Sequence, residues 1–235
     1  MYLNDKFLYI DLSKTGTVSV RNWLRDLEFT SVDETHHRKP TLAQIESSAL
    51  IFGTVRDPWS YYLSLWTYGV ARKNLSGMYL NLTRFRIHKS RGWNLSRKSS
   101  LKSIAAYPMA AFREDYKSNL QLYADQTDTV AFGIWLKKIL KPSTAVLFNG
   151  SYYGSGLHQV IGYYSYLYVL KYCMNEQAFH SATLTSIDDV FKWDAQQCYV
   201  QKFLHTHRLE FDFRDLIEPY IHDREKLDSV ISSKR

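Results

Sequence analysis

The chain has 235 residues, of which 45% are hydrophobic, and this is enough to bury a full core, so we expect a single domain over residues 1–235. Its formal net charge of +7 suits anionic ligands, but no repetitive basic tract or known DNA-reading motif accompanies the charge, and we expect no nucleic-acid partner. No apolar run of roughly 18 residues occurs, so we expect no membrane span.

The first predicted element is a buried strand over residues 7–12, which leads through a polar loop into a helix over residues 18–27. A loop entering a helix offers unpaired backbone N–H groups to an anion. Lys14 adds a positive charge, and Gly16 permits close approach of the backbone. Three hydroxyls could donate as well: Thr15, Thr17 and Ser19. The segment therefore indicates a phosphate site, with a solvated lysine in an ordinary turn as the alternative.

This loop differs from a Walker A loop. In that motif the lysine directly follows the second glycine, whereas Lys14 precedes Gly16 by two residues. The order of these residues argues against a magnesium-dependent nucleoside triphosphate site.

A second strand, over residues 49–55, repeats the layout. Arg56 follows it, at the carboxyl end where open α/β sheets bind ligands. Pro58 suits the first turn of a helix, and Ser64 lies two turns along that helix. Arg56 and Ser64 could therefore hold one anion; a surface pair of Arg56 with Asp57 is the alternative.

Together the two segments resemble the sulfotransferases that use 3′-phosphoadenosine-5′-phosphosulfate (PAPS). That family carries P-K-[ST]-G-T-[ST] after its first strand, and a later strand ends in R-[DN]-P with a serine eight residues after the arginine. Residues 13–19 and 56–64 match these motifs, most closely in the form of the Golgi carbohydrate sulfotransferases and their bacterial and viral relatives. The chain departs from the family at Ser13, where proline is usual, at Val18, where a hydroxyl residue is usual, and at Tyr61, where arginine is common.

The resemblance implies an α/β fold, a P-loop-like three-layer domain with a central, mainly parallel sheet flanked by helices. It also implies transfer of a sulfuryl group from PAPS to an acceptor hydroxyl on a carbohydrate, without a metal, leaving adenosine 3′,5′-bisphosphate. Lys14 would be catalytic, because it can stabilise the charge that grows on the leaving oxygen. The implied donor site comprises Ser13, Lys14, Thr15, Gly16, Thr17, Val18, Ser19, Arg56 and Ser64.

The acceptor hydroxyl needs a general base, usually histidine or glutamate in these enzymes. The polar stretch over residues 33–41 lies between the two motifs, where the family often carries this base. His37 is our first candidate, followed by His36 and then Glu34; solvated histidines in a polar loop are the alternative.

Two other functions stay open: a small-molecule kinase with a degenerate P-loop, and a nucleotide-binding module without turnover. Cys173 and Cys198 are far apart in sequence, without a nearby His/Cys cluster, and we expect buried thiols and no metal site. Because the first strand starts almost at Met1, we expect no signal peptide and a cytoplasmic protein of bacterial or viral type, or a Golgi form whose anchor was removed.

The rest of the chain is less informative. Residues 71–102 are polar and basic, which predicts either a lid over an anionic ligand or a solvated insertion. The Tyr-rich pattern over residues 158–174 predicts a helix whose rings form core or contact an acceptor. The other predicted elements are helices over 116–123, 129–140, 190–205 and 218–232, a short strand over 145–148 and a loop over 151–156.

Overall fold

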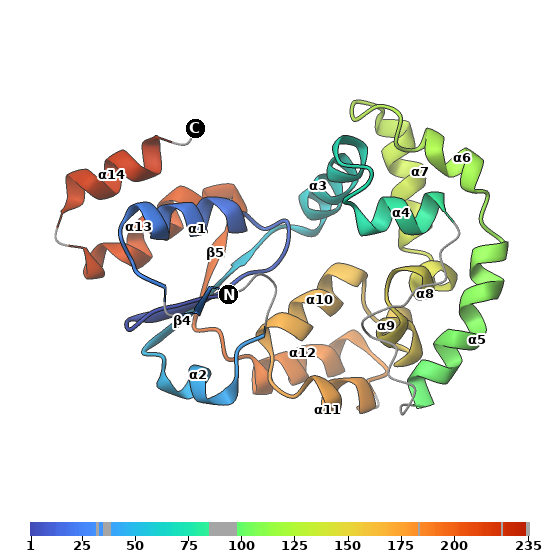
Figure 1. Ribbon diagram of the computed structural model, residues 1–235. Helices are drawn as coiled ribbons and strands as arrows, with labels where there is room; N and C mark the ends of the chain where they lie inside the picture. The colour runs from blue at the N-terminus through green and yellow to red at the C-terminus, as the bar shows by residue number, and fades with distance from the viewer. Residues whose placement is uncertain (32, 35–38, 85–97, 183, 222, 234–235) are drawn as a thin grey trace. The chain divides into compact units, whose positions relative to one another are not determined.

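The computed structural model describes residues 1–235 except 32, 35–38, 85–97, 183, 222 and 234–235 (Figure 1). The chain forms two compact units. The first comprises Met1–Asp57, Tyr168–Met174 and Gln197–Arg235, and the second comprises Pro58–Leu167 and Asn175–Gln196. Within the described residues, the strands belong to the first unit and the regular elements of the second unit are helices.

The first unit is built on an open five-stranded sheet in the order β3-β1-β2-β4-β5. Its strands are β1 (Tyr2–Leu3), β2 (Phe7–Ile10), β3 (Asp33–Glu34), β4 (Leu50–Val55) and β5 (Lys202–His205). The β2–β4 and β4–β5 pairs are parallel, while β1 is antiparallel to both β2 and β3. Four of the five strands therefore point the same way, which confirms the predicted α/β class and the mainly parallel sheet.

One face of the sheet packs against α1 (Thr17–Asp26), α13 (Leu209–Ile217) and α14 (Arg224–Ser232) (Figure 1). Side chains alternate along a strand, so one face receives every second residue. The sheet contributes Phe7, Tyr9 and Phe52 to this core, and the helices contribute Val20, Trp23, Leu24, Phe213, Ile217, Leu227 and Ile231. Burial of these apolar residues holds α1, and with it the loop that precedes it, against the sheet.

The other face of the sheet is covered at Gly53 by the end of α10 (Tyr163–Tyr172), which belongs to the first unit from Tyr168 onward. The Tyr172 hydroxyl donates to the Thr54 carbonyl at 2.6 Å, and its ring packs edge-on against Phe203 at 5.2 Å. Gly53 is needed here because the ring lies directly over the strand.

Gly53→Ala is expected to destabilise the protein by about 1–3 kcal/mol, because its Cβ would lie 2.7 Å from the Tyr172 ring and the packed core would have to move. Urea unfolding measures the change. The control is Gly133→Ala in α7 (Thr129–Ile139), where a Cβ meets no atom within 4 Å and alanine is the better helix former. Equal stability of the two variants would contradict the packing described for Tyr172.

The second unit is a helical assembly around an aromatic core. The Trp66 indole donates to the Leu122 carbonyl at 2.8 Å, and the Trp135 indole donates to the Tyr123 hydroxyl at 2.5 Å. Its remaining elements are α3 (Pro58–Ala71), α4 (Gly77–Thr83), α5 (Lys98–Phe112), α6 (Tyr116–Gln121), η1 (Pro142–Thr144), α8 (Ala145–Phe148), α9 (Gly150–Gly154), η2 (Leu157–Gln159), α11 (Glu176–Ser181) and α12 (Ile187–Gln197). In the part of the chain that is described, no helix has both the length and the apolar character to cross a membrane.

Several predicted elements are confirmed: the strands at β2 and β4 and the helices at α1, α3, α6 and α7. The predicted strand over 145–148 is wrong, since these residues form α8, whose Val146 and Leu147 pack with Tyr107 of α5. A four-residue apolar run has no periodicity that separates a strand from a buried helix. The predicted loop over 151–156 is likewise largely helical, as α9.

The C-terminal predictions also need correction. The helix predicted over 190–205 ends at Gln197, and the residues from Lys202 form β5 because they find a parallel partner in β4. The helix over 158–174 is divided into η2 and α10, and that over 218–232 into η4 (Glu218–Tyr220) and α14. Within 71–102, α4 is buried through Met78, Leu80 and Leu82, so this part is not a solvated insertion; residues 85–97 lie outside the described residues.

Candidate functional site

The candidate site lies in the first unit, where the loop of residues 11–16 leaves β2 and enters α1. The Thr15 hydroxyl donates to the Leu12 carbonyl at 2.6 Å, and the Thr17 hydroxyl donates to the same carbonyl at 2.9 Å. Both threonine side chains are buried. Because these hydroxyl protons are already used, these residues can offer an anion their backbone N–H groups rather than their side chains.

A chain of buried hydroxyls fixes the loop to β4. Thr15 Oγ1 lies 2.6 Å from Thr54 Oγ1, which lies 3.2 Å from the Tyr9 hydroxyl. Each hydroxyl has one proton, and that of Thr15 goes to Leu12, so Thr54 donates to Thr15 and Tyr9 donates to Thr54. Burial raises the pKa of Tyr9, which keeps its proton in this chain. The loop is thus held rigidly at the edge of the sheet.

The loop backbone is turned toward left-handed conformations, with φ of 69° at Lys14 and 87° at Gly16. Gly16 is the N-cap of α1, and among the described residues no side chain caps that end of the helix. A Cβ on Gly16 would also lie 2.6 Å from the Leu209 side chain, so glycine is required by both conformation and space. The first N–H groups of α1 therefore remain available to an anion.

Two cations meet at this loop. Arg56 follows β4 at its carboxyl end and donates through Nη1 to the Lys14 carbonyl at 3.2 Å. Partial burial, together with the smaller effect of the positive charge of Arg56, lowers the pKa of Lys14 to about 8. An anionic ligand that neutralises both side chains would stabilise the charged form of a lysine that is desolvated beside an arginine. Groups with such shifted pKa values are typical of functional sites.

A buried ion pair anchors the start of the loop. Arg21 of α1 donates from Nη2 to Asp11 at 3.0 Å, and both side chains are buried. The other oxygen of Asp11 accepts a hydrogen bond from the amino group of Met1 at 2.6 Å. This pair ties the first residue of the loop to the second turn of the helix that the loop enters.

The structure brings some of the predicted donor residues together and does not test the others. Residues 13–19 and Arg56 share one edge of the sheet, with Val18 exposed and Ser19 half-buried. Ser64 lies in α3 of the second unit, so its pairing with Arg56 stays a prediction. His36 and His37 lie outside the described residues.

Glu34, the third candidate for the base, is the last residue of β3. It pairs with Tyr2, which pairs with Tyr9 near the carboxyl end of β2. Since β3 runs in the same direction as β2, both strands end at the same edge of the sheet. Glu34 therefore ends its strand at the edge of the sheet at which the loop of residues 11–16 lies.

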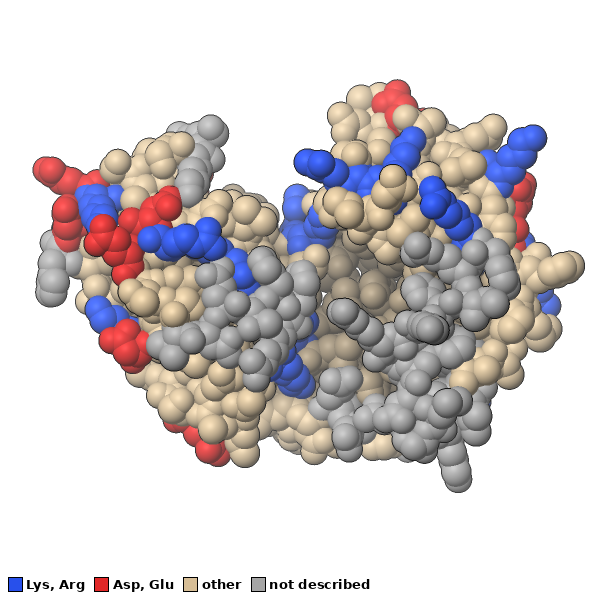
Figure 2. Space-filling model, viewed as in Figure 1, with Lys and Arg blue, Asp and Glu red and all other residues tan. Residues whose placement is uncertain are grey.

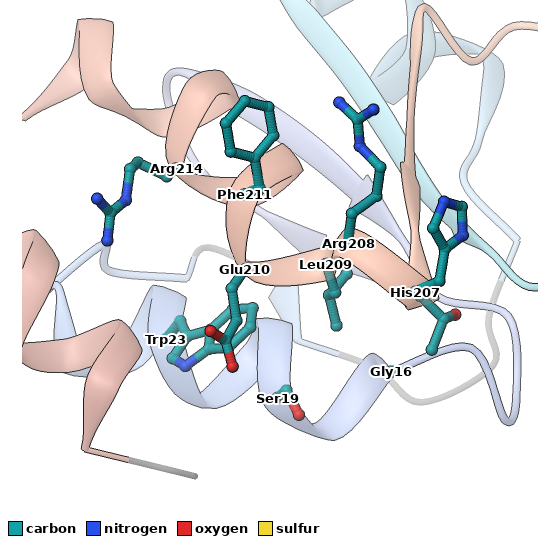
Figure 3. Close-up of a pocket in the computed structure, with 10 residues that line it drawn as sticks. Gly16, Ser19, Trp23, His207, Arg208, Leu209, Glu210, Phe211 and Arg214 are labelled. Atoms are coloured by element: carbon teal, nitrogen blue, oxygen red, sulfur yellow. The ribbon is translucent and has the colours of Figure 1, made fainter.

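A cavity of about 720 Å³ adjoins the start of α1 (Figure 3). Gly16, Ser19 and Trp23 line it from α1, and Thr206, His207, Arg208, Leu209, Glu210, Phe211 and Arg214 line it from the segment after β5. The sequence did not indicate this side of the cavity, because the helix predicted over 190–205 included the residues that form β5. The only signal was the polar run that follows the apolar pair Phe203–Leu204.

The cations of this cavity are held by carboxylates. Arg208 pairs with Asp212 at 2.5 Å, and Arg214 pairs with Asp228 at 3.0 Å. Burial opposes ionisation of Asp212, but hydrogen bonds from His205 and Arg208 outweigh it and lower its pKa. Figure 2 likewise shows acidic and basic side chains intermixed over α13 and α14. The charge of the cavity is therefore more balanced than that of the Lys14 loop.

Comparison with protein-family models, with curated proteins and with solved structures finds no match for this chain. The loop of residues 11–16 and the two strand ends that adjoin it therefore carry the functional information in this protein.

Proposed function

We propose that the protein transfers a sulfuryl group from PAPS to an acceptor hydroxyl. The observation that carries the proposal is the convergence of Lys14 and Arg56 on one loop, at the uncapped start of α1. The carbohydrate nature of the acceptor follows from the sequence resemblance alone. We further propose that the first unit is a P-loop-like three-layer domain, which its helices on both faces of the sheet support.

In this proposal the first N–H groups of α1 and the Lys14 ammonium hold the 5′-phosphosulfate. Arg56 holds the 3′-phosphate, and the sequence resemblance assigns Ser64 to the same phosphate. A site with two anion-binding ends suits a nucleotide that carries phosphate at both ends of its ribose. Lys14 and Arg56 both make charge-assisted hydrogen bonds only when the nucleotide carries the 5′-phosphosulfate and the 3′-phosphate.

The sulfuryl group would move in line from the donor to the acceptor oxygen, breaking the bond to the bridging oxygen of the phosphosulfate. Negative charge then grows on the departing phosphate oxygen. With a pKa of about 8, Lys14 is largely protonated at neutral pH and can stabilise that charge. The rigid loop matters because a preorganised charge needs no rearrangement at the moment of transfer.

The acceptor hydroxyl would lose its proton to a base on the segment that follows β3. His37 is the first candidate, His36 the second and Glu34 the third. For Glu34, the common edge at which β3 and β2 end supports this role. The base should act on the acceptor side, so its loss should spare donor binding.

Adenosine 3′,5′-bisphosphate is expected to stabilise the protein without added metal. At 100 times its dissociation constant, a ligand adds about 2.7 kcal/mol to the free energy of unfolding. For a chain of this size that is a rise in melting temperature of roughly 5–10 °C. A thermal-shift titration checks this, with ATP and magnesium as the comparison. A shift that appears only with ATP and magnesium would favour the kinase, and binding without any turnover of PAPS would favour a nucleotide-binding module.

The same assay tests the 3′-phosphate site through Arg56→Ala. Each charge-assisted hydrogen bond is worth about 1.5–3 kcal/mol, so the variant should lose its preference for the 3′-phosphorylated nucleotide over adenosine 5′-monophosphate. Ser64→Ala should do the same more weakly. The control is Arg25→Ala, which removes an exposed arginine from the last turn of α1. An unchanged preference in Arg56→Ala would remove this assignment.

A further inference from the structure

Cys173 and Cys198 lie opposite each other in a short antiparallel pairing at the end of α10, within the first unit. The Met174 N–H donates to the Gln197 carbonyl at 2.9 Å, and the Tyr199 N–H donates to the Tyr172 carbonyl at 3.0 Å. These bonds flank the two cysteines, which therefore form a non-hydrogen-bonded cross-strand pair. In such pairs the Cα atoms are about 4.5 Å apart and the side chains are close.

This geometry permits a disulfide without movement of the backbone. Disulfides span Cα separations of about 4.4–6.8 Å, and the two sulfur atoms already lie within 4.8 Å of each other. The structure holds them as thiols. The sequence predicted two thiols that are far apart. No local pattern indicates that the 24 residues between them form a loop whose two ends lie side by side.

The two thiols differ in exposure, which gives them different roles. Cys173 is buried, with 1% of its surface exposed, whereas Cys198 is half-buried. A disulfide reagent would therefore meet Cys198 first. Cys173 lies opposite Cys198, and its sulfur is close enough to attack an adduct that forms there.

We propose that Cys173 and Cys198 form a redox pair that closes to an intramolecular disulfide when a low-molecular-weight disulfide, such as oxidised glutathione, is supplied. The Cys198 thiolate attacks one sulfur of the reagent, forming a mixed disulfide and releasing one glutathione thiol. The Cys173 thiolate then attacks the Cys198 sulfur, and the second glutathione leaves as a thiol. Two cysteine thiols are oxidised and one reagent disulfide is reduced to two thiols, which take up the two protons.

The position of the pair gives the bond a structural consequence. The chain leaves the first unit after Met174 and returns to it at Gln197, so the disulfide would close the base of this excursion. Tyr172, next to Cys173, donates to the Thr54 carbonyl beneath the loop of residues 11–16. Oxidation would therefore fasten the segment that covers the second face of the sheet. This inference does not depend on the proposed sulfuryl transfer.

The experiment treats the reduced full-length protein with oxidised glutathione, quenches it with acid, and measures the intact mass and the non-reduced peptide map. Wild type is expected to lose two hydrogens and to yield a linked peptide pair containing both cysteines. Cys173→Ala should stop at a glutathione adduct on Cys198, while Cys198→Ala should stay largely unmodified. Oxidised wild type should melt several degrees higher than the reduced form, and dithiothreitol should reverse the shift.

Urea-unfolded wild type supplies the matched control. Because folding holds the two sulfurs together, the intramolecular disulfide should form more slowly in the unfolded protein. A stable adduct on wild type without linked peptides would overturn the proposal, as would disulfide-linked dimers as the main product. If Cys173→Ala does not fold, the wild-type peptide map and Cys198→Ala still decide the question.

Discussion

Lys14→Ala is expected to lower the turnover of PAPS by at least about a hundredfold while leaving the protein folded. Lys14 sits on a half-buried loop and contributes little to core packing. Its charge matters most when the bridging oxygen becomes anionic, so the interaction strengthens in the transition state. Loss of one such group typically costs about a hundredfold or more in rate. Steady-state turnover with a sulfated-product assay, beside a urea unfolding curve of the same variant, measures both effects.

The pH dependence follows from the position of the Lys14 pKa. In the ligand-free protein it is lowered from 10.5 to about 8, mainly by burial and further by Arg56. The ammonium is present below pH 8 and is lost as the pH rises through that value. The affinity for adenosine 3′,5′-bisphosphate should therefore fall above pH 8 in the wild type, and it should lose most of this dependence in Lys14→Ala.

Stability gives the complementary readout. Because the folded protein disfavours the charged form of Lys14, the free energy of unfolding should rise with pH between about 8 and the ordinary lysine pKa of 10.5.

The left-handed φ of 69° also strains any side chain at position 14, so Lys14→Gly should be more stable than Lys14→Ala by about 1 kcal/mol. Near-normal turnover in both variants would show that this lysine is not catalytic.

The second large effect is expected at the buried pair of Asp11 and Arg21. Arg21→Met should destabilise the protein by about 3–5 kcal/mol, because it leaves a buried carboxylate without its guanidinium partner. The remaining contact of Asp11 with the Met1 amino group places the cost toward the lower end of this range. Guanidinium unfolding at neutral pH measures the loss.

The double variant Asp11→Asn/Arg21→Met separates the pair from its packing. Removing both charges takes away the unpaired ion, so the double variant should be less destabilised than the sum of the two single variants. Arg25→Met on the same helix is the matched control, since Arg25 is exposed, and its cost should stay within about 0.5 kcal/mol. Strict additivity of the two single effects would mean that the ion pair does not anchor the loop.

The local parts of the candidate site could be predicted because they depend on neighbouring residues. An apolar run ending in a polar, glycine-containing loop and then an amphipathic segment identified β2, the loop of residues 11–16 and α1. The rule that ligands bind at the carboxyl ends of parallel strands placed Arg56 at that edge. The role of Thr15 could not be predicted in the same way, since only the pairing of β2 with β4 brings its hydroxyl to Thr54. The sequence likewise did not show that the Thr17 hydroxyl donates to the Leu12 carbonyl.

By itself, therefore, the sequence determined the α/β class, the two strand-loop-helix segments and the cations that accompany them. Only the tertiary structure decided that residues 202–205 form a strand and residues 145–148 a helix, that the segment after β5 walls a cavity beside Gly16, and that Cys173 faces Cys198. The reason is the range of the interactions. Periodicity and capping act over a few residues, whereas the partner of β5 lies some 150 residues away along the chain, at β4. A segment as short as β5 has too little hydrophobic periodicity of its own to specify its secondary structure. Its pairing with the distant β4 therefore determines that it forms a strand.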